Sequence, residues 1–414
     1  MSRFSRRGCP PLPTRRALLA FAAGGALSTS LSGCAVPTRL AAVPRGQASA
    51  ATVLGVRNER FFPTEAAGQA GLQQEFVAAA ERQLASRGLP TTVPLLDLDL
   101  LGISGGGENG AFGAGLLNGW TERGDRPTFF LVTGISTGAL SAPFAFLGSD
   151  WDARLKSVYT DITLADVLVQ RWYTAAIWND GMADNTPLFR TISRYLDEMM
   201  LAEIASAYDG GRMLLIATSD LDAQMPVIWN IGAIAKSGHP KALDTVRRIL
   251  LASSAIPGAF SPVLFDVTLD GQSFQELHVD GGAFAQVFLY PPSVSQFRRE
   301  RLSRRLPVAR ARAWVIRNGR LDPEWASVDR RTIGITGRAI TAMISASSYN
   351  DVLRIYAAAE RDGVDYNLAY IGRDFTVEYD KPFDQAYMRP LFEYGRQHGL
   401  RGDAWVKRPP FRGS

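Results

Sequence analysis

Short apolar runs alternate with longer segments of helical periodicity through most of this 414-residue chain. The runs span residues 93–103, 129–132, 213–217, 227–231 and 313–316. Continuous apolar runs of this length are typical of strands that are buried on both faces, which occur mainly in parallel sheets. The alternation therefore predicts an α/β fold with three layers, in which helices flank a mainly parallel central sheet.

The rest of the chain divides around this region. Residues 93–400 show no internal repeat and no change of composition, so we expect them to form one domain. Residues 65–92 have apolar residues at helical spacing and predict a helical extension. Residues 34–64 begin with a stretch rich in Ala, Pro, Gly, Ser and Thr and predict a tether, and residues 401–414 a C-terminal tail.

The first 33 residues resemble a bacterial export signal. An arginine-bearing start, which includes Arg15 and Arg16, precedes an apolar stretch and then small residues up to Cys34. The sequence Leu-Ser-Gly-Cys that ends at Cys34 is similar to a lipobox, which predicts cleavage before Cys34 and a lipid anchor on its thiol. Ala35 favours the outer membrane slightly, because it is not the aspartate that retains lipoproteins at the inner membrane. A noncleaved anchor helix and either the Sec or the twin-arginine route remain open.

Charge and cysteine content exclude several classes of function. The five arginines of residues 1–33 account for the whole formal net charge of +5, so the remaining chain is neutral and no nucleic-acid partner is expected. The chain has two cysteines and three histidines in total, and Cys9 would leave with the signal. We therefore expect no disulfide, no metal and no cofactor.

One local cluster of charge is basic. Seven arginines lie between residues 298 and 312, with Glu300 as the only acid among them: Arg298, Arg299, Arg301, Arg304, Arg305, Arg310 and Arg312. A solvated surface is one interpretation. The other is a membrane-facing patch that meets anionic lipid headgroups and turns the active site toward them.

A nucleophile motif follows the second apolar run. Residues 134–138 read Gly-Ile-Ser-Thr-Gly, which matches the G-x-S-x-G pattern of a serine on a sharp turn between a strand and a helix. The apolar run 129–132 before it and the helix-like stretch 139–147 after it supply that context. Ser136 is therefore the candidate nucleophile, and it needs a nearby base.

The three histidines are poorly placed to serve as that base. His239 lies in a turn-like Ser-Gly-His-Pro, His278 in a strand-like segment, and only His398 follows in the order of a Ser-Asp-His triad. Oxyanion donors are easier to find, because Gly105, Gly106 and Gly107 follow the first apolar run and precede a helix-like stretch. Glycines allow backbone amides to turn toward a developing negative charge.

Taken together, these motifs resemble the patatin-like phospholipase family over residues 98–291. The glycine loop at Gly105, the elbow at Ser136, the segment 252–260 and the Asp-Gly-Gly at Asp280 occur in the family's order. The resemblance implies a serine acyl hydrolase that cleaves acyl esters of lipids by a Ser136–Asp280 dyad, with the oxyanion held by Gly105 to Gly107. It also implies that residues 93–400 form the catalytic domain and that neither cofactor nor metal takes part.

Two departures from the family pattern and two alternative functions stay open. Asn109 stands where many members have Arg or Lys, and Gln286 stands where an asparagine is common after Asp-Gly-Gly. The alternatives are an esterase with a Ser-His-Asp triad that uses His398, and a catalytically silent, lipid-binding envelope lipoprotein. The sequence does not predict the oligomeric state or the headgroup of the substrate.

Overall fold

The structure is a computed structural model that describes residues 38–90, 97–170, 183–323 and 332–410, together with residues 325, 327, 328 and 330. Cys34 and the predicted export signal lie outside the described residues. No helix among the described residues is long and apolar enough to cross a bilayer.

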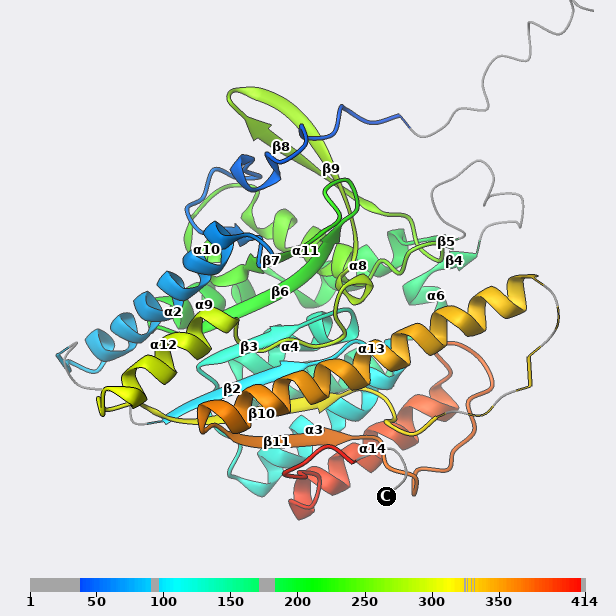
Figure 1. Ribbon diagram of the computed structural model, residues 1–414. Helices are drawn as coiled ribbons and strands as arrows, with labels where there is room; N and C mark the ends of the chain where they lie inside the picture. Colours follow the sequence, from blue (N-terminus) through cyan, green and yellow to red (C-terminus); the bar gives the residue numbers. More distant parts are fainter. Residues whose placement is uncertain are drawn as a thin grey trace, which may run out of the picture.

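A mixed sheet forms the centre of the molecule (Figure 1). Its nine strands in the described chain have the order β1-β7-β6-β3-β2-β10-β11, and β9 pairs with β6 and with β8 beside this path. The five strands from β6 to β11 along this order run parallel to one another, whereas β1, β7, β8 and β9 join by antiparallel pairing. The strands are β1 (Arg60–Phe61), β2 (Asp97–Ile103), β3 (Leu131–Gly134), β6 (Met213–Asp220), β7 (Met225–Asn230), β8 (Val263–Leu269), β9 (Gln272–Asp280), β10 (Arg310–Arg317) and β11 (Asp365–Tyr370).

Side chains of each central strand alternate between two hydrophobic cores. Leu100 belongs to one core and Leu101 to the other, and Leu215 and Ile216 divide in the same way. Every residue of β6 is buried, which explains why its sequence is an apolar run instead of an apolar–polar alternation. The prediction of an α/β fold with a mainly parallel sheet is confirmed.

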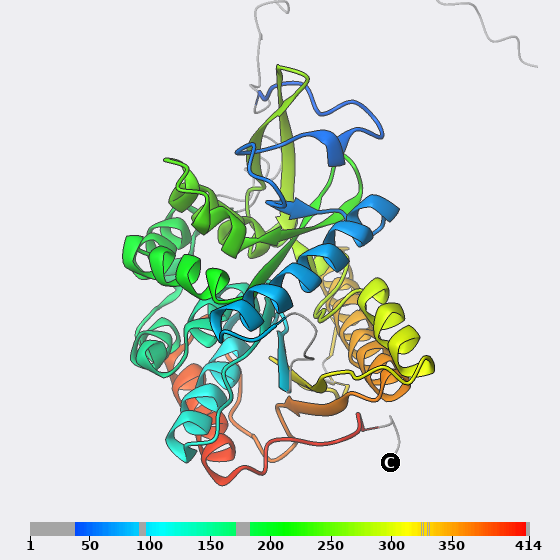
Figure 2. The same cartoon turned by 90° about the vertical axis from the view of Figure 1, so that its left-hand side faces the viewer.

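Helices cover both faces of the sheet (Figures 1 and 2). One face carries α2 (Ala66–Ser86), α12 (Pro292–Ser303) and α13 (Thr332–Asp362). The other face carries α3 (Gly110–Arg123), α4 (Thr137–Leu147), α5 (Asp152–Thr160), α8 (Thr186–Tyr195), α9 (Glu198–Asp209), α10 (Ile231–Lys236), α11 (Ala242–Ser253) and α14 (Gln385–Arg401).

Short elements complete the chain. They are the helix α6 (Leu164–Val167), the two-stranded pair β4 (Val169–Gln170) and β5 (Ala183–Asp184), and the 3-10 turns η2 (Ala48–Ala50), η3 (Gly107–Asn109), η4 (Ser149–Trp151) and η5 (Gly281–Ala283). Two of these turns, η3 and η5, follow directly on the glycine loop and on Asp280. They therefore sit where the site is built.

The predicted tether over residues 34–64 is wrong for its described part. Strand β1 pairs with β7, and Phe61 and Phe62 are buried in the two cores. Arg60 makes a buried ion pair with Glu276 of β9. The composition of residues 38–52 suggested a flexible segment, but apolar side chains only ten residues later hold it against the domain.

The predicted C-terminal tail also belongs to the domain. The Trp405 ring lies 4.8 Å from the ring centroids of both Trp120 and Trp314, and Val406 exchanges backbone hydrogen bonds with Leu368 of β11. The folded unit therefore extends on both sides of the predicted boundaries 93 and 400.

The arginine cluster and Ser136 lie at opposite edges of the sheet. Arg310 begins β10 and is in register with Asp97 at the start of β2, whereas Ser136 follows the far end of the parallel strand β3. The seven residues of β2 separate these edges by about 23 Å. Several of the arginines are engaged locally, such as Arg298 with backbone carbonyls and Arg312 with Asp99. The orientation that we expected for this cluster is therefore incorrect.

Candidate active site

Ser136 occupies a strained turn between β3 and α4. Its backbone has φ 56° and ψ −126°, a conformation that non-glycine residues rarely adopt. Such strain persists only where surrounding structure holds it, and it is a known feature of nucleophile elbows. The Ser136 amide donates to the Ser253 hydroxyl at 3.0 Å, and Ser253 in turn donates to the Ala217 carbonyl of β6.

The two flanking glycines of the motif are required by close backbone approach. A Cβ atom at Gly138 would lie 2.2 Å from the carbonyl oxygen of Ile103, and one at Gly134 would lie 2.5 Å from the carbonyl oxygen of Gly138. Neither neighbour can move, because both are backbone atoms of the central elements. The G-x-S-x-G pattern thus follows from the packing of α4 across the ends of β2 and β3.

Asp280 meets Ser136 from the antiparallel side of the sheet. Asp280 is the last residue of β9 and is in register with Thr218 of β6. Strand β6 lies two strands from β2 in the sheet. The Gly282 amide donates to the Asp280 Oδ1 at 2.7 Å, and the Ser136 side chain lies near enough to favour the charged form of the Asp280 carboxylate. Burial raises the pKa of Asp280 from its ordinary value of 3.8 to about 6, although Ser136 and the Gly282 amide oppose the shift. A carboxylate of this basicity is well suited to accept a proton near neutral pH.

The glycine loop lies against the serine, but not all of its amides are available. A Cβ atom at Gly105 would lie 3.2 Å from the Ser136 Cβ, which places the loop beside the nucleophile. The Gly105 amide donates to the Gln286 carbonyl at 3.0 Å, so it is already satisfied. In the described part of the chain the amides of Gly106 and Gly107 have no acceptor. Of the three candidate oxyanion donors, Gly106 and Gly107 therefore keep their amides available.

Gln286 connects this loop to the turn that carries Asp280. Its side-chain amide donates to the Gly282 carbonyl at 2.8 Å, while its backbone carbonyl accepts from Gly105. Its own backbone amide donates to the Asp351 carboxylate of α13 at 2.6 Å. The glutamine that departs from the family pattern thus holds both halves of the site together.

A buried arginine hydrogen-bonds to the glycine loop. Arg317, at the end of β10, is 7% exposed and donates to the Gly105 carbonyl at 3.0 Å. That carbonyl and the Gly106 amide belong to one peptide group, so the guanidinium polarises the amide as a donor. Asn109 is occupied elsewhere, because its Oδ1 accepts from the Tyr387 hydroxyl at 2.7 Å. Arg317 thus places a positive charge beside the glycine loop, which no sequence motif indicated.

His398 is excluded as the base by the packing of α14 on α3. Tyr387 of α14 bonds to Asn109 beside the glycine loop, and α14 then runs away from the site along α3. His398 lies eleven residues further along, about 16 Å at 1.5 Å per residue. Its Nδ1 is 2.7 Å from Asp403, and its ring meets the Tyr394 ring edge to face. The triad alternative therefore lacks its histidine.

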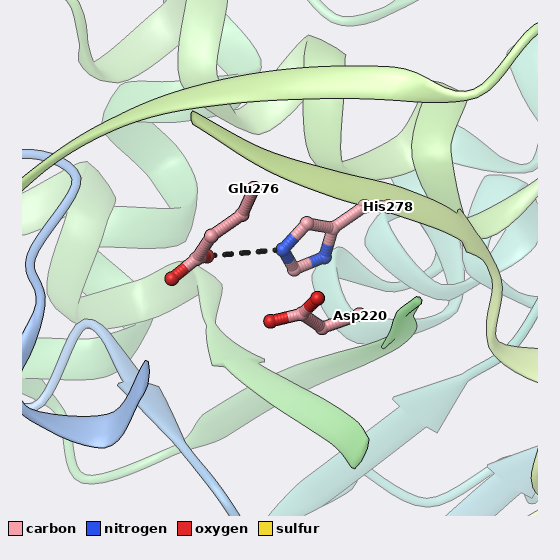
Figure 3. Close-up of side chains that lie close together, drawn as sticks. All are labelled: Asp220, Glu276 and His278. Atoms are coloured by element: carbon pink, nitrogen blue, oxygen red, sulfur yellow. Dashed lines mark hydrogen bonds and ion pairs between the residues drawn. The ribbon is translucent and has the colours of Figure 1, made fainter. Parts of the chain in front are cut away.

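His278 belongs to a buried polar group with Glu276 and Asp220, two residues before Asp280 on β9 (Figure 3). Its Nε2 lies 3.1 Å from Glu276 and its Nδ1 lies 2.9 Å from the Thr218 hydroxyl. Asp220 completes a group whose ligand atoms lie within 4.8 Å of one another. Two nitrogens of Arg60 bind both oxygens of Glu276, so a cation is already present. We interpret the group as a neutralised support of β9 and not as a metal site.

A small apolar pocket opens off the nucleophile helix. The Leu140 amide donates to the Ser136 carbonyl, so Leu140 lies one helical turn from the nucleophile. The pocket is lined from α4, α5, α8, α9, α11 and the residues that follow α5 and α8: Leu140, Pro143, Phe144, Val158, Ile162, Leu188, Thr191, Ile192, Tyr195, Leu196, Met200 and Leu250. The wall is mainly hydrocarbon, and the free volume is about 40 Å³.

Comparison with known proteins agrees with this geometry. A family model described as patatin-like phospholipase matches residues 101–291, which contain Ser136, Asp280 and the glycine loop. Residues 101–291 form a patatin-like phospholipase domain. This patatin-like domain supports lipid acyl hydrolase activity for the chain.

Thirteen chains of solved structures match the patatin-like domain and its surroundings. One of them is VipD from Legionella pneumophila, which is 11% identical, with a TM-score of 0.33 over 84% of this chain and 70% of that chain. No curated protein matches the sequence.

Replacement of Asp280 by Asn should stabilise the domain at high pH. Because the folded-state pKa of Asp280 is raised, the ionised carboxylate costs stability that increases from pH 3.8 to about 6 and stays constant above. We expect Asp280→Asn to raise the free energy of unfolding by up to about 3 kcal/mol at pH 8 and by little at pH 4. Urea unfolding at both pH values measures this difference.

The matched control is Asp322→Asn. Arg373 holds the pKa of Asp322 below its ordinary value, so this substitution should bring no gain at pH 8. A loss of stability at pH 8 in Asp280→Asn would show that Asp280 is not a desolvated carboxylate.

Proposed function

We propose that this chain hydrolyses acyl esters of lipids through a covalent acyl-Ser136 intermediate, with Asp280 as the base and without histidine. The observation that carries the proposal is the placement of Ser136 beside the buried Asp280 carboxylate, near enough to favour the charged form of that carboxylate. It supplies the base that a serine hydroxyl requires, in a position that none of the three histidines occupies.

In the first half-reaction the Ser136 oxygen attacks the acyl carbonyl and its proton passes to Asp280. The carbonyl oxygen becomes an oxyanion that accepts hydrogen bonds from the Gly106 and Gly107 amides. When the tetrahedral intermediate collapses, the bond to the alcohol breaks and the alcohol takes the proton from Asp280. The products of this step are the free alcohol and acyl-Ser136.

In the second half-reaction a water molecule replaces the alcohol. Asp280 accepts a proton from the water as its oxygen attacks the acyl carbon, and the same amides stabilise the new oxyanion. Collapse breaks the bond to Ser136, whose oxygen recovers the proton from Asp280. The fatty acid leaves and the dyad is restored.

We place the acyl chain of the substrate toward the apolar pocket beside Leu140, whose free volume of about 40 Å³ would have to widen to take a long chain. A carbonyl held at Ser136 can direct its chain along α4, because the pocket begins one turn away on that helix. Its wall is almost entirely hydrocarbon, so it would favour chains by burial and not by hydrogen bonding. The proposed substrates are thus phospholipids, lysophospholipids or glycerides, all of which present such a chain.

Dyad variants test the mechanism. We expect Ser136→Ala, Asp280→Asn and the double variant to lose turnover of a long-chain ester to a similar floor, by on the order of 10³ or more, because residues that act as a unit are not additive. His398→Ala, the control, should retain most activity. If His398→Ala is as inactive as Ser136→Ala while Asp280→Asn remains active, the triad esterase is correct. If a fluorophosphonate fails to label Ser136 in the native chain, the protein is a silent lipid-binding lipoprotein.

Filling the pocket should shorten the preferred acyl chain. With Leu140→Trp we expect kcat/KM for twelve- to sixteen-carbon esters to fall on the order of tenfold, while that for four-carbon esters changes little. A series of esters of graded length measures the shift. Met199→Trp is the control, since Met199 is 51% exposed on α9. An equal loss for short and long chains would place the acyl group elsewhere.

A further inference from the structure

Helix α13 is much longer than the strands on which it packs. It has 31 residues, about 46 Å, whereas β10 has eight residues, about 27 Å. It runs antiparallel to the parallel strands, because β11 follows directly after its end. Its N-terminal half therefore extends beyond the edge of the sheet where Ser136 lies, as Figure 1 shows for the yellow-orange end of α13.

Helix α13 contacts the candidate active site at the point where the helix leaves the sheet. The Asp351 carboxylate accepts from the Gln286 amide at 2.6 Å, and Gln286 holds both the glycine loop and the Asp280 turn. Residues of α13 before Asp351 therefore project from the mouth of the site itself.

The projecting half carries an exposed apolar stripe of its own. In the packed half, Val352, Ile355 and Ala359 lie at helical spacing and are buried in the core beneath α13. Ile340, Met343 and Ile344 lie at i, i+3 and i+4 spacing two to three turns earlier, and they are 48%, 71% and 37% exposed. This stripe is turned by about 100° from the buried face and is open to solvent.

Charge around this stripe indicates what would cover it. Residues 330–350 contain three arginines and no Asp or Glu, although acidic and basic residues nearly balance in the chain as a whole. Apolar side chains accompanied only by positive charge match the phosphate layer and the underlying hydrocarbon of a phospholipid surface. This end of α13 therefore combines apolar and basic residues, as a segment that contacts a phospholipid surface would.

We propose that the N-terminal half of α13 is the segment that docks the protein on a phospholipid bilayer, with Ile340, Met343 and Ile344 inserted among the headgroups. The proposal rests on the proposed function for its choice of lipid as the partner. Docking at this edge places Ser136 against the membrane, whereas the arginine cluster near Arg310 lies at the opposite edge.

Vesicle binding tests the proposal without any need for catalysis. Every contact described above lies within residues 38–410, so the chain from residue 35 onward is used, which removes the predicted anchor. It carries Ser136→Ala so that the vesicles stay intact. Binding to vesicles of phosphatidylcholine with phosphatidylglycerol is measured by cosedimentation for the parent and for Ile340→Asp/Met343→Asp. We expect the double substitution to weaken binding tenfold or more, on the order of the effect of two inserted side chains.

The matched control is Leu302→Asp/Leu306→Asp. Leu302 and Leu306 are each 43% exposed, similar to Ile340, but they lie at the opposite edge of the sheet. This control should bind vesicles as the parent does. Equal loss in both pairs, or no loss in the α13 pair, would overturn the proposal.

Two further readouts separate the remaining explanations. With Ser136 restored, the α13 pair should lose hydrolysis of vesicle lipid but keep that of a soluble short-chain ester within about twofold, because the site itself is untouched. If the parent cleaves neither the vesicle lipid nor the soluble short-chain ester, the proposed function is wrong, but the vesicle-binding result is unaffected. If the α13 pair instead turns a dimer into a monomer in sedimentation equilibrium, the stripe is an interface between two copies and the lipid proposal is wrong.

Discussion

The approach of Ser136 to the Asp280 carboxylate joins two segments that are 144 residues apart and belong to different parts of the sheet. It requires that β9 enter the sheet antiparallel to β6, so that its last residue reaches the edge where the parallel strands end. It also requires the backward turn at Ser136, which only small neighbours permit. The pairing of β9 with β6 and the turn at Ser136 together bring these two side chains close to each other.

Burial changes the pKa of the Asp280 carboxylate. Desolvation raises the pKa of Asp280 to about 6, so the carboxylate is ionised at neutral pH yet basic enough to share a proton with serine. In the proposed mechanism the developing negative charge would be met by the amides of Gly106 and Gly107, next to the buried Arg317. Arg60, Glu276 and His278 form a buried network that ties β9 to β1.

Local sequence rules were sufficient for the central strands and for the turns that carry Ser136 and Asp280, because each depends on a few adjacent residues. The G-x-S-x-G turn and the Asp-Gly-Gly turn are steric necessities that leave a readable pattern. Contacts between distant segments leave no such pattern. Nothing near Gly105 in the sequence shows that Gln286 takes its amide, and nothing near Asn109 points to Arg317. For the same reason residues 38–64 were mistaken for a tether, since the partner of Arg60 lies 216 residues away.

The pH dependence of Ser136 acylation tests most directly whether a desolvated aspartate is the base. The rate at which a fluorophosphonate labels Ser136 in the intact chain, measured from pH 4 to 9, should rise once, with a midpoint near pH 6 that matches the raised pKa of Asp280. The same profile should be seen when His239, His278 and His398 are replaced together in a chain that still folds. A midpoint near the ordinary aspartate value, or a profile that disappears with His398 alone, would contradict the account.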